Sequence, residues 1–121
     1  MISKQQIQKA VDKEYKLYID GNWVDSSGND RIKSYNPSDG SLLSEFIDAT
    51  DVDVDRAVDS AHRAFKNWKS VGREQRSRLL LKIADIIDEN REHLALVETL
   101  DNGKPLRETL NVDVPASAGH F

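Results

Sequence analysis

The sequence contains no cysteine among its 121 residues. The chain can therefore form no disulfide, no thiolate zinc site and no covalent intermediate on a cysteine. Long apolar runs are also missing, so no segment is predicted to cross a bilayer. The first residues lack the apolar stretch of a secretory signal, and we expect a cytoplasmic location.

The sequence has no large excess of charge of either sign, since 17 basic and 21 acidic side chains give a formal net charge of −4. A mild acidic excess disfavours nucleic acid as a partner. One basic stretch runs from Arg73 to Lys82, but acidic residues interrupt and follow it, as on a solvated helix face. We therefore expect neither a nucleic-acid partner nor a membrane partner.

Turn residues divide the first 50 positions into short strands. Asp20-Gly21-Asn22 lies between two apolar segments and predicts a β-hairpin. Residues 31–35 alternate in polarity, and the Pro- and Gly-containing turn at 36–40 separates them from a further strand, Leu42 to Ala49. Three or four short antiparallel strands are thus predicted between Leu17 and Ala49. Before them, residues 3–13 fit either a short helix or a frayed terminal arm.

From Thr50 onward the apolar residues recur at helical spacing. Thr50 is a predicted N-cap, and an apolar stripe then runs from Val54 to Trp68. A second helix is predicted from Arg73, with Leu79 and Ile83 among the residues facing inward. A bend or restart is expected near Asn90, which we interpret as the cap of a continuation to Leu100.

The last predicted helices are short. Gly103 is expected to end the preceding helix in the left-handed conformation. Pro105 would then open a short helix through Leu110, and Asp113 would cap a final one. Phe121 extends the stripe of that final helix without a stop residue, so we expect a chain that has been cut. The helices together require a covering sheet that we expect later in the chain.

Five segments resemble the beginning of the aldehyde dehydrogenase superfamily, in the family's order and spacing. The most distinctive is Glu98-Thr99-Leu100-Asp101-Asn102-Gly103-Lys104-Pro105, which nearly repeats the family's pattern at this position. The other four are the ribbon at 18–24, the Asn-Pro turn at 35–40, and the two helices at 55–68 and 76–87.

The resemblance implies an α/β fold with a Rossmann-type coenzyme domain, of which residues 1–121 would be the N-terminal part, with the catalytic domain absent. It implies NAD(P)-dependent oxidation of an aldehyde substrate to an acid by a homo-oligomeric enzyme. The family's catalytic Cys, Glu and Asn, and its dinucleotide-binding units, would all follow Phe121. The resemblance therefore places no catalytic or cofactor-binding residue in this segment, which we expect to be inactive and to bind neither NAD nor NADP.

The segment 101–105 is the one candidate site. Its structural interpretation is a helix C-cap, with Gly103 supplying a positive φ and Pro105 preventing continuation. The resemblance implies a second, compatible interpretation, a monovalent-cation site in which the Asp101 carboxylate joins backbone carbonyls near Ser34 and Tyr35. The three histidines are scattered, and no phosphate-binding loop surrounds Lys104.

Three hypotheses about function remain open from the sequence. The first is an inactive portion of a dehydrogenase. The second is a non-catalytic interaction module that associates with itself or with full-length dehydrogenase subunits through exposed apolar helix faces. The third is a small helical regulator that reuses the beginning of the fold for unrelated binding.

Overall fold

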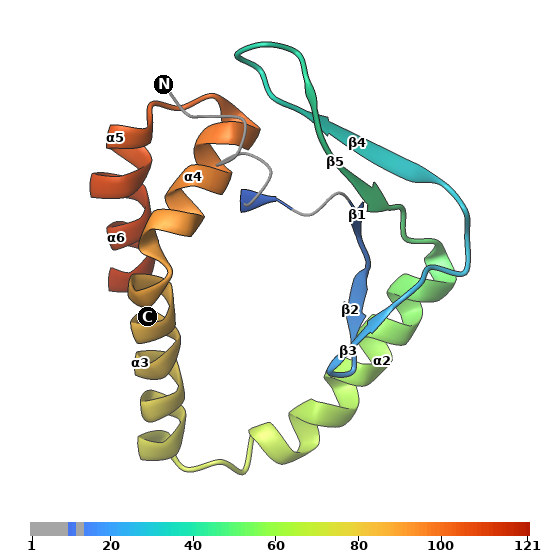
Figure 1. Cartoon of the computed structure of the whole chain (residues 1–121). Helices are drawn as coiled ribbons and strands as arrows, with labels where there is room; N and C mark the ends of the chain where they lie inside the picture. Colours follow the sequence, from blue (N-terminus) through green and yellow to red (C-terminus); the bar gives the residue numbers. More distant parts are fainter. Residues whose placement is uncertain (1–9, 12–13) are drawn as a thin grey trace. The chain divides into compact units, whose positions relative to one another are not determined.

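The structure is a computed structural model that describes residues 10–11 and 14–121, in the element order shown in Figure 1. The helix predicted over residues 3–13 therefore lies almost entirely outside the described residues. The rest divides into two compact units. The first contains residues 10–11, 35–43 and 72–121, and the second contains residues 14–34 and 44–71.

The predicted hairpin is confirmed. Strand β2 (Leu17–Ile19) pairs antiparallel with β3 (Asn22–Val24), and Ile19 is directly opposite Asn22. The two residues between the strands, Asp20 and Gly21, have φ values of 55° and 77°. Two successive positive φ angles are typical of the type I′ turn, whose twist matches that of the flanking strands.

A second sheet has the strand order β1–β5–β4. Strands β4 (Arg31–Tyr35) and β5 (Leu42–Ile47) confirm the two predicted strands, although β5 ends two residues before Ala49. Strand β1 (Glu14–Tyr15) has no counterpart among the predicted strands; it is only two residues long and pairs with β5 in parallel. The Tyr15 and Phe46 rings stack at a centroid distance of 5.2 Å, which supports this short pairing.

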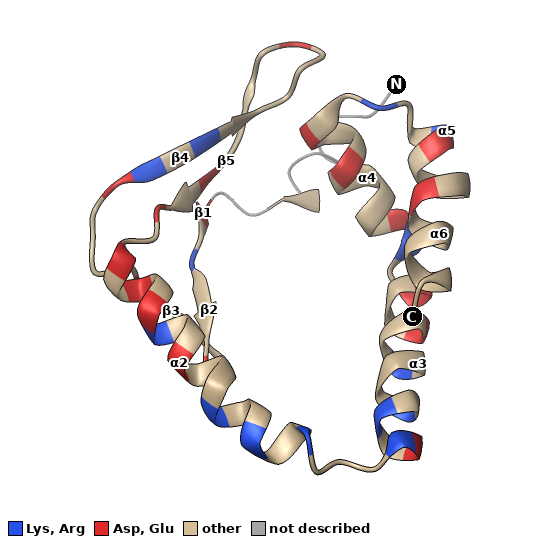
Figure 2. Ribbon diagram, turned by 180° about the vertical axis from the view of Figure 1, so that it is seen from behind, with Lys and Arg blue, Asp and Glu red and all other residues tan. Residues whose placement is uncertain are grey.

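Helix α2 (Asp51–Trp68) begins at Thr50, as predicted. The Thr50 side chain accepts a hydrogen bond from the Asp53 backbone N–H, and the Asp53 side chain accepts one from the Thr50 backbone N–H. This reciprocal capping box satisfies two donors at the helix start. Acidic residues occupy the beginning of α2 and basic residues its end (Figure 2), an order that the helix dipole favours.

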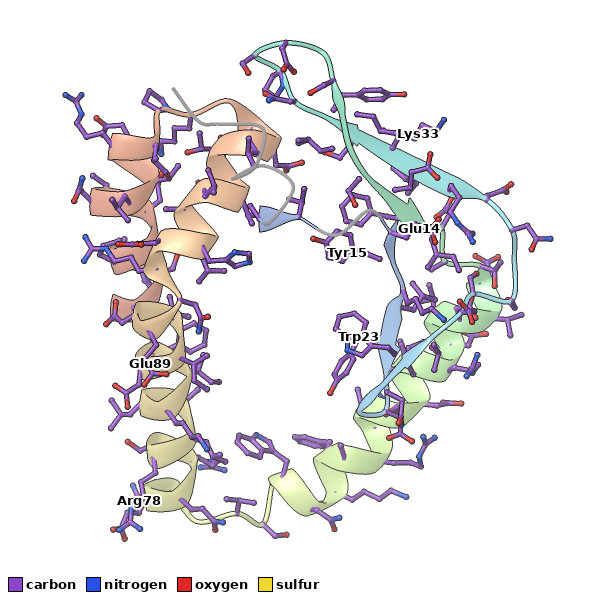
Figure 3. All side chains as sticks on the ribbon, in the orientation of Figure 1. Glu14, Tyr15, Trp23, Lys33, Arg78 and Glu89 are labelled. Carbon is purple, nitrogen blue, oxygen red and sulfur yellow. The ribbon has the colours of Figure 1, made fainter. Side chains whose placement is uncertain are left out.

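Helices α3 (Arg73–Glu89) and α4 (Arg91–Asn102) confirm the predicted break at Asn90. Asn90 occupies the predicted N-cap position of α4, but its side chain makes no cap hydrogen bond there. Its Nδ2 instead donates to the Ile86 carbonyl at 2.8 Å, so Asn90 closes α3. Figure 3 labels Arg78 and Glu89, which lie in α3, and Arg78 pairs with Glu74 one turn away at 2.6 Å.

The C-terminal segment differs from the prediction of two separate helices. Helix α5 (Leu106–Glu108) continues through a π-helical turn, η1 (Thr109–Asp113), into α6 (Val114–Gly119). Asp113 has helical φ and ψ and makes no cap bond, so its predicted capping role is wrong.

Pro115 gives the π turn a physical reason. Proline has no N–H to donate to a carbonyl of the preceding turn. The Leu110 carbonyl in that turn accepts a hydrogen bond from Arg91 Nε at 2.7 Å. A π turn commonly accommodates such a local change in the hydrogen-bond ladder.

Few apolar side chains are buried. The core of the first unit is a cluster of Ala10, Leu43 and Leu100, with Leu96 and Val97 packed against it. Helix α6 contacts α3 and α4 and buries Val114 and Ala118. By contrast, the stripes that the sequence placed inside are exposed, because α3 has no buried residue and α2 buries only Asp53. Among the described residues, no helix is long and apolar enough to cross a membrane.

Candidate functional site

The turn after α4 is the predicted candidate site, and the structure confirms its C-cap. Gly103 has φ 78° and ψ 6°, and its N–H donates to the Thr99 carbonyl at 3.0 Å. The Asn102 side-chain oxygen accepts a hydrogen bond from the Lys104 N–H at 2.8 Å. These bonds satisfy backbone groups that the helix end leaves without partners.

Gly103 also lies against the Asn-Pro turn of the same unit. A Cβ built on Gly103 would lie 2.8 Å from Pro37 Cγ, closer than side-chain atoms normally approach. The turn is closed by its own hydrogen bond, since the Gly40 N–H donates to the Asn36 carbonyl at 2.8 Å. Two of the five recognisable segments, 35–40 and 98–105, thus pack directly on each other.

A charge pair and a hydroxyl pair attach the turn to the next helix. Lys104 Nζ lies 2.5 Å from Asp113 Oδ2, and this contact raises the pKa of Lys104 above its ordinary value. Thr109, which is fully buried, donates from Oγ1 to the Ala95 carbonyl at 3.0 Å and lies 2.9 Å from Thr99 Oγ1. The Lys104 side chain therefore has a structural role, because it pairs with the Asp113 carboxylate in η1.

The predicted cation ligands occupy two elements. Ser34 and Tyr35 are the last residues of β4, and Asp101 lies in the last turn of α4. Tyr35 and Asp101 belong to the first unit, whereas Ser34 belongs to the second. In the described part of the chain, no group of three or more His, Asp or Glu side chains is arranged to hold a metal ion. A site of one carboxylate and backbone carbonyls is a different kind of site and stays a prediction.

One buried carboxylate, Asp53, accepts several hydrogen bonds and was not among the predicted site residues. Asp53 is 1% exposed, and its Oδ2 accepts hydrogen bonds from Ser26 Oγ at 2.6 Å and from the Ser27 N–H at 3.1 Å. Thr50 donates a further two, from its N–H and its Oγ1. The hydrogen bond from Ser26, followed by those from Thr50 and Ser27, holds the Asp53 pKa well below its ordinary value despite burial.

Asp53 therefore joins the loop after β3 to the start of α2. The Thr-x-x-Asp spacing gave a partial indication, because it matches a capping box. Nothing in the sequence showed that Ser26 and Ser27 would come to the same carboxylate.

The junction between β5 and α2 lacks the features of a dinucleotide phosphate site. Phosphates bind where a glycine-rich loop leads from a strand into a free helix N-terminus. The junction between β5 and α2 consists of Asp48, Ala49 and Thr50 and has no glycine. The Asp53 carboxylate already occupies the start of α2, and Asp48 and Asp51 add negative charge that repels a phosphate. No dinucleotide-binding role is assigned to this junction.

Comparison with known proteins decides the family. The sequence model of the aldehyde dehydrogenase family matches residues 23–121, which is more than half of the chain. The chain belongs to the aldehyde dehydrogenase family. It is 44% identical over 107 residues to the acetaldehyde dehydrogenase of Pseudomonas aeruginosa, covering 88% of this chain and 21% of that protein.

Solved structures agree with this aldehyde dehydrogenase assignment. PnpE from Pseudomonas sp. WBC-3 superimposes with a TM-score of 0.83 at 45% identity, over 87% of this chain and 22% of that one. The NAD⁺ complex of the aldehyde dehydrogenase from Bacillus cereus superimposes with a TM-score of 0.87 at 33% identity, over 98% of this chain and 24% of that one.

The resemblance in the sequence and the α/β fold class are thereby confirmed for this aldehyde dehydrogenase chain. The chain spans only 21–22% of the length of the curated relatives it matches.

Proposed function

We propose that residues 1–121 form the N-terminal part of the coenzyme-binding domain of an NAD(P)-dependent aldehyde dehydrogenase. The observation that carries this proposal is the continuous family match from residue 23 to Phe121. The reaction of such an enzyme converts an aldehyde, water and NAD(P)⁺ to a carboxylic acid, NAD(P)H and a proton.

We also propose that this segment is catalytically inactive alone and binds neither coenzyme. Covalent aldehyde oxidation needs a thiolate nucleophile, and the sequence has no cysteine. The segment's contribution to an enzyme is then structural: it supplies a hairpin and amphipathic helices on which other parts of the protein pack. The purified chain should be incubated with NAD, NADP and a panel of aldehydes while the absorbance of reduced nicotinamide is followed. Turnover by the chain alone would overturn this proposal.

A monovalent-cation site remains a proposal, with the Asp101 carboxylate and the backbone carbonyls of Ser34 and Tyr35 as ligands. Oxygen donors suit hard cations. If the site exists, replacing sodium or potassium with tetramethylammonium at equal ionic strength lowers the melting temperature of the chain. Asp101→Asn should abolish that difference. Equal melting temperatures in all three salts would count against the site.

Self-association, or association with full-length dehydrogenase subunits, is the second candidate function. It is favoured by the exposure of large apolar side chains along α2 and α3, for example Phe65 at 59% and Leu81 at 58%. Sedimentation over a concentration series tests it, since a strictly monomeric 13.7 kDa species contradicts self-association. The cytoplasm is the proposed location, which fractionation of the producing cells would check.

A further inference from the structure

The sequence contains three pairs in which glycine follows aspartate or asparagine: Asp20-Gly21, Asp39-Gly40 and Asn102-Gly103. Such pairs are chemically reactive, because glycine has no side chain to hinder attack by its own backbone nitrogen on the preceding side-chain carbonyl carbon. The attack closes a succinimide ring within the chain and needs no enzyme. In a folded protein its rate depends on whether the nitrogen and the carbon are free to approach each other.

The glycine nitrogen is held by a hydrogen bond in two of the pairs. The Gly40 N–H donates to the Asn36 carbonyl at 2.8 Å, and the Gly103 N–H donates to the Thr99 carbonyl at 3.0 Å. Each bond must break before the nitrogen can turn toward the neighbouring side chain. The Asn-Pro turn and the helix C-cap therefore slow the reaction at these two glycines.

The Asp39 carboxylate is held by the same turn as its glycine. Its Oδ1 accepts hydrogen bonds from the Ser41 N–H at 2.9 Å and from Ser41 Oγ at 2.6 Å. These bonds join residues only two positions apart, so they are present whenever the turn is formed. Both reacting groups of Asp39-Gly40 are thus restrained.

The hairpin turn leaves the nitrogen of Gly21 free. Strands β2 and β3 are paired up to Ile19 and Asn22, outside the two central residues. Within the part of the chain that the structure describes, no group accepts a hydrogen bond from the Gly21 N–H. The type I′ turn accounts for this, because its closing bond joins the flanking residues and does not use the second central N–H. Among the three pairs, only Asp20-Gly21 has no such bond to break.

The backbone of Asp20 is also strained. Its φ of 55° makes it the only residue other than glycine with a positive φ in the described ranges. This region is unfavourable for a residue that carries a Cβ. Ring closure requires rotation about the Asp20 backbone, and rotation out of this region relieves the strain. Asp39 has no positive φ and gains nothing of this kind.

Helix α2 restrains the Asp20 side chain. Ser60 Oγ donates a hydrogen bond to Asp20 Oδ1 at 2.9 Å, and Arg63 Nη2 lies 3.4 Å from Oδ2. The Asp20 side chain is nevertheless 68% exposed, so both contacts compete with water and are weak. They slow the reaction without preventing it.

We propose that Asp20-Gly21 is a self-modifying site, at which the backbone isomerises through a succinimide. The Gly21 nitrogen attacks Cγ of the protonated Asp20 carboxyl. A C–N bond forms, and the carboxyl hydroxyl leaves as water with the proton of the nitrogen. A second water molecule then cleaves the bond between that nitrogen and the Asp20 backbone carbonyl carbon. The product is an isoaspartyl residue, whose backbone runs through Cγ and whose former backbone carbonyl is a free carboxylate.

The modification changes the attachment of the hairpin to α2. An isoaspartyl residue adds a methylene group to the backbone and removes the side chain that contacts Ser60 and Arg63. The longer loop no longer matches the two-residue turn that places Leu17 opposite Val24. Isomerisation therefore loosens the hairpin as the molecule ages. The proposal goes beyond the proposed part in an aldehyde dehydrogenase and does not depend on it.

Peptide mapping of the aged full chain tests the proposal. The chain is incubated at neutral pH, folded or in urea, and then digested with trypsin. Basic residues place Asp20, Asp39 and Asn102 on three different tryptic peptides. Electron-transfer fragmentation distinguishes isoaspartate from aspartate, which has the same mass. Isoaspartate should accumulate at Asp20 but not at Asp39 in the folded chain, and at both positions at similar rates in urea.

Two matched variants measure the effect of the held nitrogen more directly. Asp20→Asn and Asp39→Asn each create an Asn-Gly pair, lose ammonia in place of water and keep an Oδ1 acceptor. In the folded chain Asp20→Asn should deamidate about tenfold faster than Asp39→Asn or more, because one hydrogen bond must open first at Gly40. In urea the two rates should be similar. Circular dichroism verifies that both variants keep the fold.

Ser60→Ala tests the restraint from α2. It removes the hydroxyl that bonds to Asp20, so isoaspartate should form faster at position 20 and at an unchanged rate at Asp39. An unchanged rate at both positions would show that Ser60 does not restrain the site.

Three results overturn the proposal. One is equal conversion of Asp20 and Asp39 in the folded chain, and the second is faster conversion of Asp39. The third is a folded chain that stays unmodified at Asp20 over the time in which the chain in urea converts both residues.

Discussion

Gly103 and Pro37 pack so closely that a Cβ on Gly103 would lie 2.8 Å from Pro37 Cγ. The contact joins the turn that ends α4 to the Asn-Pro turn between β4 and β5. Gly103 also needs φ 78°, which other residues rarely adopt. One glycine thus meets two separate requirements, one of backbone conformation and one of space.

Gly103→Ala should lower the free energy of unfolding by about 2–3 kcal/mol, because it adds the left-handed strain to a steric clash. Gly40→Ala has the same positive φ but open space around its Cβ, so it should cost only the strain, about 1 kcal/mol. Urea unfolding followed by circular dichroism measures both. Trp fluorescence is unsuitable here, since Trp23 and Trp68 both lie in the other unit. Equal losses in the two variants would show that the Pro37 contact contributes nothing.

Asp53→Asn should lower the free energy of unfolding at neutral pH. It should also make that free energy depend less on pH in the acidic range. The folded-state pKa of Asp53 lies below its ordinary value of 3.8, so the unfolded chain takes up the proton first. The stabilisation is present above about pH 4 and is lost as the pH falls toward the folded-state pKa. Urea midpoints of the two proteins, measured from about pH 6 to pH 3, should therefore converge. A difference that stays constant over this range would contradict the role of the charge.

Thr109→Val should lower the free energy of unfolding by about 1–2 kcal/mol. The substitution keeps the volume of the side chain but removes a buried hydroxyl that bonds to the Ala95 carbonyl and to Thr99. Thr99→Val combined with Thr109→Val removes both hydroxyls and should cost less than the sum of the single losses. Thermal unfolding of the unaltered chain, the two single variants and the double variant gives the four free energies of this double-mutant cycle. Strict additivity would mean that the two hydroxyls do not interact.

Lys104→Met should destabilise the chain more than Lys104→Met combined with Asp113→Asn. The single change leaves a carboxylate, whose Oδ2 is buried, without its cation, whereas the double change removes both charges. The raised pKa of Lys104 means that the pair stabilises the fold at neutral pH and loses that effect only as the pH rises through this pKa. Urea midpoints at neutral pH rank the variants, and the reverse order would exclude the ion pair as a stabilising contact.

Local patterns predicted the elements that local chemistry determines. The Asp-Gly turn, the Thr50 cap, the break at Asn90 and the Gly103 stop were all found where the sequence placed them, because each depends on residues within a few positions. The family followed from the order of such segments.

Predictions that depended on distant partners failed or stayed open. Strand β1 has no pattern of its own, and it pairs with the distant strand β5, where the Tyr15 ring stacks on Phe46. The π turn depends on Pro115 together with Arg91, which is far away in the sequence. The Asp53 network needs Ser26 and Ser27 in addition to the nearby Thr50. For the cation site, no local pattern brings Asp101 together with Ser34 and Tyr35, and the site remains untested.

The most direct test of the central claim is a chimera in which residues 1–121 replace the matching segment of the acetaldehyde dehydrogenase of Pseudomonas aeruginosa. If this chain is the N-terminal part of such an enzyme, the chimera reduces NAD with acetaldehyde while residues 1–121 alone do not. A folded, coenzyme-loaded chimera without activity, or turnover by the chain alone, would contradict the account.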